Sequence, residues 1–125
     1  MAYVDGFVLV VPRRRLKEYK RVAQKAGKIW KEYGAVSYVE CVGDDLKPRW
    51  NFPKMAKPKA GETIVFSWIT YKSKAQRDRV NKKVMADPRV TEMMDPENMP
   101  FDMKRMAYGG FKDDGDLLTG PAGAE

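Results

Sequence analysis

Histidine is absent from this 125-residue chain, and cysteine occurs once, at Cys41. The absence of histidine excludes Ser-His-Asp and Cys-His catalysis, histidine-ligated haem and zinc sites built from Cys and His ligands. A single cysteine allows no disulfide within the chain, which fits a reducing compartment. Acid–base chemistry must therefore come from carboxylates, tyrosines, lysines or a bound cofactor, and the sequence itself indicates neither a metal nor a cofactor.

Long hydrophobic runs are missing as well, since no apolar stretch approaches the roughly 20 residues of a membrane span. The amino terminus enters a predicted strand without the basic-then-apolar pattern of a signal peptide, so we expect a cytoplasmic protein without membrane contact. The net charge of +7 would suit an anionic partner. However, the basic residues are spread along the chain and no nucleic-acid-binding motif occurs, so a solvated surface is favoured over an RNA or DNA interface.

Hydrophobic periodicity predicts four strands and two helices. The strands are expected at residues 3–11, 36–42, 62–71 and 103–111, and the helices at residues 13–33 and from Ser73 to the pair at 87–88. Ser73 followed by Gln76 matches a capping box at the start of the second helix, and Gly34 suits the end of the first. Gly27 lies inside the first helix, where glycine is unfavourable, which indicates that something packs closely against it.

The order strand-helix-strand, strand-helix-strand is typical of an α+β, ferredoxin-like split βαβ fold. In this fold the first and third strands form the centre of a four-stranded antiparallel sheet, with both helices on one face. We expect residues 1–112 to form this single domain and residues 113–125 to be a disordered tail. Residues 44–61, which include three prolines, and residues 89–101, rich in Met and Pro, are expected to be loops.

Side chains alternate across a strand, so the predicted strands divide into two faces. The face expected under the helices holds Val4, Gly6, Val8, Val10, Val39, Cys41, Ile64, Phe66, Trp68, Met106 and Tyr108, and Cys41 is expected to be buried there. The second face holds Tyr3, Asp5, Phe7, Leu9, Tyr38, Glu40, Val42, Val65, Ser67, Ile69, Arg105 and Ala107. Because the second face is too apolar for water, we expect a homodimer in which two sheets pair through it as an α/β barrel.

The second face also carries the candidate site. An ionised Asp5 inside a strand needs a partner, and Arg105 on the neighbouring strand is expected to pair with it. The candidate catalytic groups are Asp5 and Glu40. The candidate ligand-binding residues are Tyr38, Ser67, Arg105, Trp50 and Phe52, the last two as a lid over the barrel. The alternatives, a structural ion-pair network for the acids and ordinary packing for the two aromatics, are favoured.

Segments spread over residues 2–112 resemble the YbaA-like family of unknown function. They include YVDGF (3–7), YVECV (38–42), VFSWI (65–69), MADPR (85–89), MPFD (99–102) and YGGF (108–111). Met103 stands where this family is expected to have a glycine. The family is similar to the dimeric α/β-barrel superfamily, and this resemblance implies the same sheet-to-sheet pairing. It carries over no catalytic residue.

The superfamily includes cofactor-independent monooxygenases, isomerases, haem proteins and small stress-response proteins. By this analogy we expect the chain to bind or transform a small organic molecule in the barrel, in the manner of an oxygenase or isomerase. The alternative is a non-catalytic interaction or stress-response protein whose barrel is filled by its own side chains, and a weak nucleic-acid binder ranks third. A cavity of roughly 300 Å³ or more with the acids converging on it would favour binding.

Overall fold

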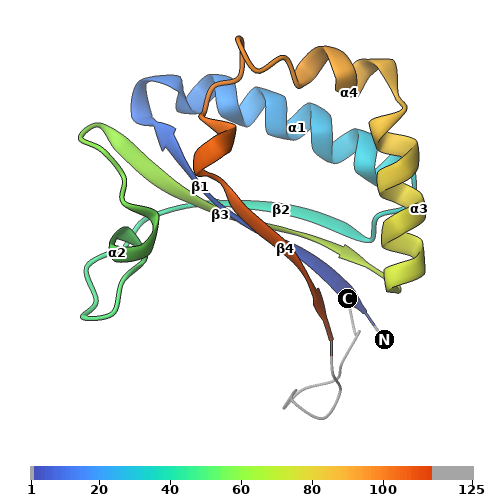
Figure 1. Cartoon of the computed structure of the whole chain (residues 1–125), viewed down its shortest axis with the longest axis horizontal. Coiled ribbons are helices and arrows are strands. Elements are labelled where there is room, and N and C mark those ends of the chain that lie inside the picture. Colours follow the sequence, from blue (N-terminus) through green and yellow to red (C-terminus); the bar gives the residue numbers. More distant parts are fainter. Residues whose placement is uncertain (1, 114–125) are drawn as a thin grey trace.

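The computed structural model describes residues 2–113 (Figure 1). Of the tail predicted at residues 113–125, only Asp113 lies within the described residues. Its backbone N–H donates to the carbonyl of Ala2 at 3.0 Å. Within the described range, no helix has both the length and the hydrophobicity to span a membrane.

Four antiparallel strands of the described chain form one sheet in the order β2-β3-β1-β4. They are β1 (Tyr3–Pro12), β2 (Ser37–Val42), β3 (Glu62–Tyr71) and β4 (Ala107–Lys112). β1 and β3 occupy the central positions predicted for them and pair along their whole length. The prediction of an α+β fold is confirmed, but β4 begins at Ala107 rather than at residue 103, because Met103–Arg105 form a 3-10 turn.

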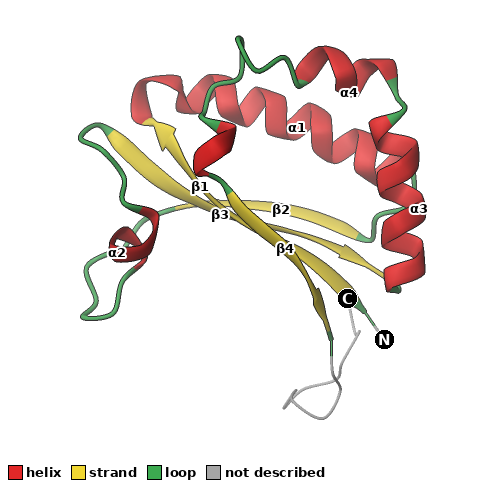
Figure 2. Cartoon of the chain, in the orientation of Figure 1, coloured by secondary structure: helices red, strands yellow, loops and turns green. Residues whose placement is uncertain are grey.

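The long first helix, α1 (Leu16–Glu32), follows a 3-10 turn at Arg13–Arg15 and crosses one face of the sheet (Figure 2). Its buried stripe includes Tyr19, Ala23 and Gly27, spaced four residues apart as an amphipathic helix requires. A Cβ atom at Gly27 would lie 2.9 Å from Cδ1 of Tyr38 on β2. The close contact predicted at this glycine is therefore confirmed, and it brings α1 down onto the sheet.

The same face is covered by α3 (Lys74–Met85) and α4 (Pro88–Met93). α3 begins where the capping pattern predicted, with the Ser73 hydroxyl accepting the backbone N–H of Gln76 at 3.1 Å. α4 lies in a stretch that the sequence predicted as a loop. The Asp87 carboxylate caps it by accepting the N–H of Arg89 at 2.8 Å, and Pro88 suits its first turn. The Asp-Pro pair thus ends one helix and starts the next.

The helices cover the face of the sheet opposite to the one predicted. The residues of β1, β2 and β3 that were predicted to share a face do share one, since the register pairs Asp5 with Ile69 and Glu40 with Ser67. These residues lie under the helices together with the buried Leu9, whereas the prediction placed them toward a second subunit. Alternation could not decide between the faces because both are largely apolar. In β4 the register pairs Tyr108 with Phe7. Tyr108 therefore lies on the covered face, as predicted, but it shares that face with Phe7 and not with Val4 and Val8 as the prediction had it.

The uncovered face carries Cys41, Phe66, Trp68 and Phe111. Cys41 is exposed there, so the prediction of a buried cysteine was wrong. The segment that connects β2 to β3 covers one end of this face. Its short helix, α2 (Phe52–Ala56), packs below the sheet, on the side away from α1 (Figure 2). The Phe52 ring lies 6.1 Å from that of Phe66.

Candidate functional site

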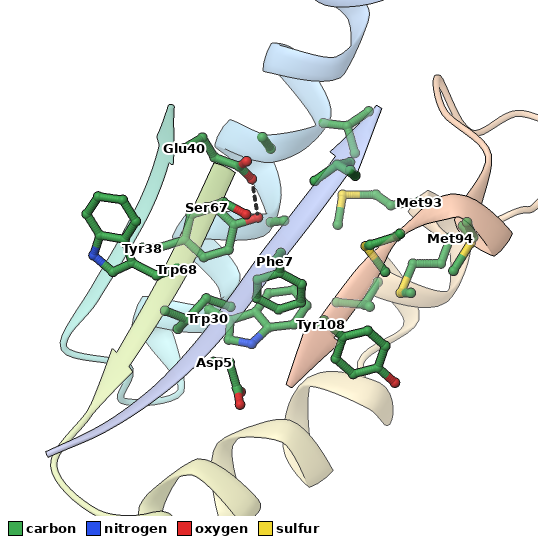
Figure 3. Close-up of a pocket in the computed structure, with 18 of the residues that line it drawn as sticks. Asp5, Phe7, Trp30, Tyr38, Glu40, Ser67, Trp68, Met93, Met94 and Tyr108 are labelled. Atoms are coloured by element: carbon green, nitrogen blue, oxygen red, sulfur yellow. Dashed lines mark hydrogen bonds between the residues drawn. The ribbon is translucent and has the colours of Figure 1, made fainter. Parts of the chain in front are cut away.

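A cavity of about 480 Å³ lies between the covered face of the sheet and the helices (Figure 3). Strands β1, β2 and β3 form its floor, α1 forms one wall, and residues 85–106 form another. Residues that the sequence did not single out, such as Ala26 of α1 and Val90 of α4, line it as well. The cavity is therefore a property of a single chain and needs no second subunit to form.

Most of the lining is apolar and much of it is aromatic or sulfur-containing. The aromatic side chains are Phe7, Tyr19, Trp30, Tyr38, Phe101 and Tyr108, and the methionines are Met85, Met93, Met94, Met99, Met103 and Met106. Every one of these methionines comes from one continuous segment, which supplies a wall of flexible thioethers. Such side chains adapt their shape to aromatic neighbours.

Glu40 is the centre of a polar cluster in this lining. The Tyr19 hydroxyl, brought by α1, donates to Glu40 Oε1 at 2.7 Å, and the Tyr38 hydroxyl, two residues along β2, donates to Oε2 at 3.1 Å. Ser67 lies directly opposite Glu40 on β3, and its hydroxyl contributes to lowering the pKa of the carboxyl. We refer to Glu40, Tyr19, Tyr38 and Ser67 as the Glu40 cluster.

Burial shapes the ionisation of this cluster. It raises the pKa of the Glu40 carboxyl, and the hydrogen bonds from Tyr19, Tyr38 and Ser67 oppose that rise. Burial, followed by the neighbouring Glu40 charge, also raises the pKa of both tyrosines far above the ordinary phenol value. The two phenols consequently keep their protons and serve as hydrogen-bond donors to the carboxylate.

Asp5 lines the same cavity but has a charged partner. It is only 4% exposed, and its Oδ1 accepts a hydrogen bond from Nη1 of Arg77 on α3 at 3.0 Å. Arg77 also lies over the ring of Tyr3, with the guanidinium carbon 4.8 Å from the ring centroid. The prediction that Asp5 needs a cationic partner was right, but the residue predicted for that role was wrong.

Arg105, the predicted partner, lies in the 3-10 turn before β4 and points elsewhere. Its Nη1 and Nη2 atoms each lie 2.8 Å from a carboxylate oxygen of Glu62, so the two side chains form a bidentate ion pair. The hydrogen bond from Arg105 lowers the pKa of Glu62 to about 2. Because residues 103–105 are not part of the strand, the alternation that placed Arg105 beside Asp5 did not apply.

Of the predicted site residues, the structure brings Asp5, Tyr38, Glu40 and Ser67 together around the cavity. It leaves out Arg105, Trp50 and Phe52. Trp50 is 83% exposed, and Phe52 packs on the uncovered face of the sheet. The two aromatics do not form a lid over this cavity, because the segment that carries them turns toward the opposite face of the sheet. A lid over a barrel between two sheets stays a prediction.

Several cavity residues were missed by the sequence analysis. Tyr19 had a usable signal, since it lies on the apolar stripe of α1 and its hydroxyl then needs a buried partner. Asn81 had no signal in the sequence. Its Oδ1 accepts hydrogen bonds from the Trp30 indole N–H and the Tyr71 hydroxyl, each at 3.3 Å, and this arrangement depends on how α3 packs on the sheet. Among the described residues, no group of three or more His, Cys, Asp or Glu is placed to hold a metal ion.

Comparisons with known proteins agree with the family resemblance noted in the sequence. A profile of the family described as "Protein of unknown function (DUF1428)" matches residues 2–103. The "Uncharacterized protein YbaA" of Escherichia coli strain K12 is 46% identical over 114 residues, covering 90% of this chain and 96% of that protein. The YbaA protein of Shigella flexneri matches to the same extent.

Two solved structures share the fold at low sequence identity. An uncharacterized NIPSNAP domain protein from Burkholderia xenovorans superimposes with a TM-score of 0.54 and 14% identity, over 90% of this chain and 94% of that one. Rv0793 from Mycobacterium tuberculosis has a TM-score of 0.51 and 9% identity, over 90% and 95% of the two chains. At such identities these likenesses concern the fold alone.

Proposed function

We propose that this chain, which belongs to the DUF1428 family of unknown function, binds a small organic molecule in the cavity between its sheet and its helices. The observation that carries the proposal is an apolar cavity of about 480 Å³ with one hydrogen-bonded carboxylate cluster in its wall. Ligand sites typically measure about 300–1,000 Å³ and combine apolar walls with a few placed polar groups. The binding site then lies inside each chain, and not in a barrel between two subunits as the sequence predicted.

The cavity favours binding over the structural alternative, in which the chain fills its own interior. A tightly packed core has few voids larger than a water molecule, whereas this space could admit a ligand. The Glu40 cluster also lies where a ligand would reach it. A network that served only to fix strand register would need no such opening beside it.

Filling the cavity tests this proposal. Ala26 lines it from α1, so Ala26→Leu should weaken binding of the neutral apolar dye N-phenyl-1-naphthylamine about tenfold or more while leaving the fold intact. Lys20→Leu, which adds the same side chain on the exposed face of α1, is the matched control. Dye fluorescence gives the affinity, and native mass spectrometry of the freshly purified chain checks for a retained ligand. The proposal would be contradicted if the unmodified chain bound no dye and also retained no ligand.

A second candidate function adds proton transfer at Glu40 to binding. Burial raises the pKa of this carboxyl, which suits a group that takes up and returns a proton closer to neutral pH. By superfamily analogy the reaction would resemble that of a cofactor-independent oxygenase or an isomerase. Asp5 is the weaker candidate for this role because Arg77 already pairs with it.

For the assembly, we propose a sheet-to-sheet homodimer of the ferredoxin-like α/β-barrel kind, formed through the uncovered face. Phe66 is 44% exposed on this face and Phe111 is 63% exposed. Large aromatic side chains grouped on one uncovered sheet favour contact with another protein surface. Two sheets that pair in this way would leave both cavities intact on the outer sides.

A further inference from the structure

The hydrogen atoms of the Glu40 cluster determine what a ligand can offer it. A phenol has one proton to donate and lone pairs with which to accept. The protons of Tyr19 and Tyr38 are already directed to the two oxygens of Glu40, at 2.7 and 3.1 Å. Ser67 lies directly opposite Glu40 on β3. What remains free is a set of lone pairs on the phenol oxygens and on the carboxylate, so the cluster selects a ligand that donates a hydrogen bond.

The charges around the cavity select against anions. Among residues 2–113, Glu40 has hydrogen-bonded neighbours but no Lys or Arg within ion-pair distance, so an anionic ligand would meet an unbalanced carboxylate. The charge of Asp5 is balanced by Arg77. These observations disfavour an anionic ligand.

The apolar walls favour a flat, aromatic body. Phe7 and Tyr108 stack with their ring centroids 5.7 Å apart and planes 20° from parallel, while Trp30 and Tyr38 lie 6.0 Å apart. Figure 3 shows these rings on one side of the cavity and the thioethers of Met93 and Met94 on another. Sulfur atoms of methionine make favourable contacts with the edges of aromatic rings. A planar ring system placed between the two walls would contact both.

We infer that the ligand class of this cavity is an aromatic molecule that carries no negative charge and has a hydroxyl group that donates a hydrogen bond to the Glu40 cluster. The inference rests on the proposed function, because it names the ligand of the same cavity. It goes further in specifying the direction of the hydrogen bond: the ligand donates and the protein accepts.

A matched series of ligands tests the direction of this bond. 2-Naphthol has the donor, 2-methoxynaphthalene has the same ring and oxygen without the donor, and 2-naphthoate is an anion. Competition with the bound dye should show that naphthol binds about tenfold or more tightly than the methoxy compound, with naphthoate weakest. Glu40→Gln should reduce the naphthol preference to near unity, because its amide also donates and releases a phenol proton toward the ligand. Glu92→Gln on the exposed side of α4 should leave the ratio unchanged.

The outcomes separate this inference from the proposed function. Equal binding of naphthol and its methoxy analogue to the unmodified chain, or tighter binding of naphthoate, overturns the inference while binding in the cavity stands. A naphthol preference that survives in folded Glu40→Gln also overturns it. Failure of all three compounds and of the dye, with no retained ligand, overturns both. If Glu40→Gln does not fold, the ratios in the unmodified chain alone decide the matter.

Discussion

The two carboxylates of the cavity, Asp5 and Glu40, are stabilised by different kinds of neighbour. Asp5 accepts from the guanidinium of Arg77 on α3, and Glu40 accepts from neutral hydroxyls. An ion pair in a buried position makes each partner dependent on the other, whereas a carboxylate among hydroxyls can change its protonation state and keep its neighbours. We therefore expect the Asp5–Arg77 ion pair to contribute to the stability of the fold, and the protonation state of Glu40 to respond to pH.

Arg77→Met should destabilise the fold by about 3 kcal/mol, because it leaves the Asp5 carboxylate buried without its cation. Lys74→Met, which removes an exposed ion pair to Asp78 on the same helix, is the control and should change stability by about 0.5 kcal/mol or less. Urea denaturation measures both. Equal effects of the two substitutions would show that the Asp5–Arg77 pair contributes no more than a surface pair.

Glu40 and Glu62 should shift the pH dependence of stability in opposite directions. Glu40 has a folded-state pKa raised above 4.5, so the stability it contributes is fully present below that pH and is lost as pH rises through the folded pKa. The unfolding free energy of the unmodified chain should accordingly fall, relative to Glu40→Gln, as pH rises above 4.5. Urea titrations at successive pH values measure this difference.

Glu62 supplies the opposite case in the same experiment. Its pKa falls from 4.5 to about 2 in the folded chain, so its contribution is present above 4.5 and is lost as pH falls toward 2. The stability difference between the unmodified chain and Glu62→Gln should therefore shrink on acidification. A difference that changes with pH in the same direction for both variants would contradict the assigned shifts.

At the scale of elements, the contact between α1 and β2 at Gly27 leaves little room for a side chain. Alanine is intrinsically better in a helix than glycine by about 1 kcal/mol. Gly27→Ala should nevertheless destabilise the chain by about 1–3 kcal/mol, since its Cβ would lie 2.9 Å from the ring of Tyr38. Chemical denaturation measures the effect. In a Tyr38→Ala background the same substitution should become neutral or stabilising; destabilisation there as well would exclude the ring contact as the cause.

The elements themselves were largely predictable from the sequence, and their packing was not. Periodicity located β1 and β3, and the cap at Ser73 marked the start of α3. α4 was missed because its six residues carry no repeated apolar stripe, and its Asp-Pro start also reads as the end of α3. The sequence placed strand residues on common faces but could not say which face the helices cover. That choice depends on how Tyr19 and Arg77 dock from other elements.

The candidate site was predictable to the same limited extent. Alternation placed Asp5, Tyr38, Glu40 and Ser67 on one face, and the structure gathers them around the cavity. The predicted site residues that lie outside the cavity, Arg105, Trp50 and Phe52, come from segments outside the strands, where alternation gives no direction. The alternation rule holds only while the backbone remains extended.

At the scale of the whole molecule, the uncovered sheet face should decide the oligomeric state. Sedimentation velocity is expected to show a dimer for the unmodified chain and a monomer for Phe66→Glu, because a carboxylate at the centre of an apolar contact is costly to bury. Lys25→Glu, on the exposed side of α1, changes charge by the same amount and should remain dimeric. A stable monomer for the unmodified chain would rule out the sheet-to-sheet assembly.

Binding in the cavity should be independent of that assembly. Because the lining comes from one chain, Phe66→Glu should bind the dye as the unmodified chain does. This separates the present arrangement from a site built between two subunits. If Phe66→Glu lost dye binding together with the dimer, the binding site would have to lie between the two subunits.

The methionine wall gives this chain built-in spectroscopic reporters. Six methionines of residues 85–106 line the cavity, while Met55 on α2 is 84% exposed on the opposite side of the sheet. With ¹³C-methyl-labelled methionine, a ligand that enters the cavity would shift resonances from the wall and leave that of Met55 in place as an internal reference. Aromatic ring currents make such shifts large, so occupancy of the cavity can be followed by nuclear magnetic resonance without any substitution in the chain.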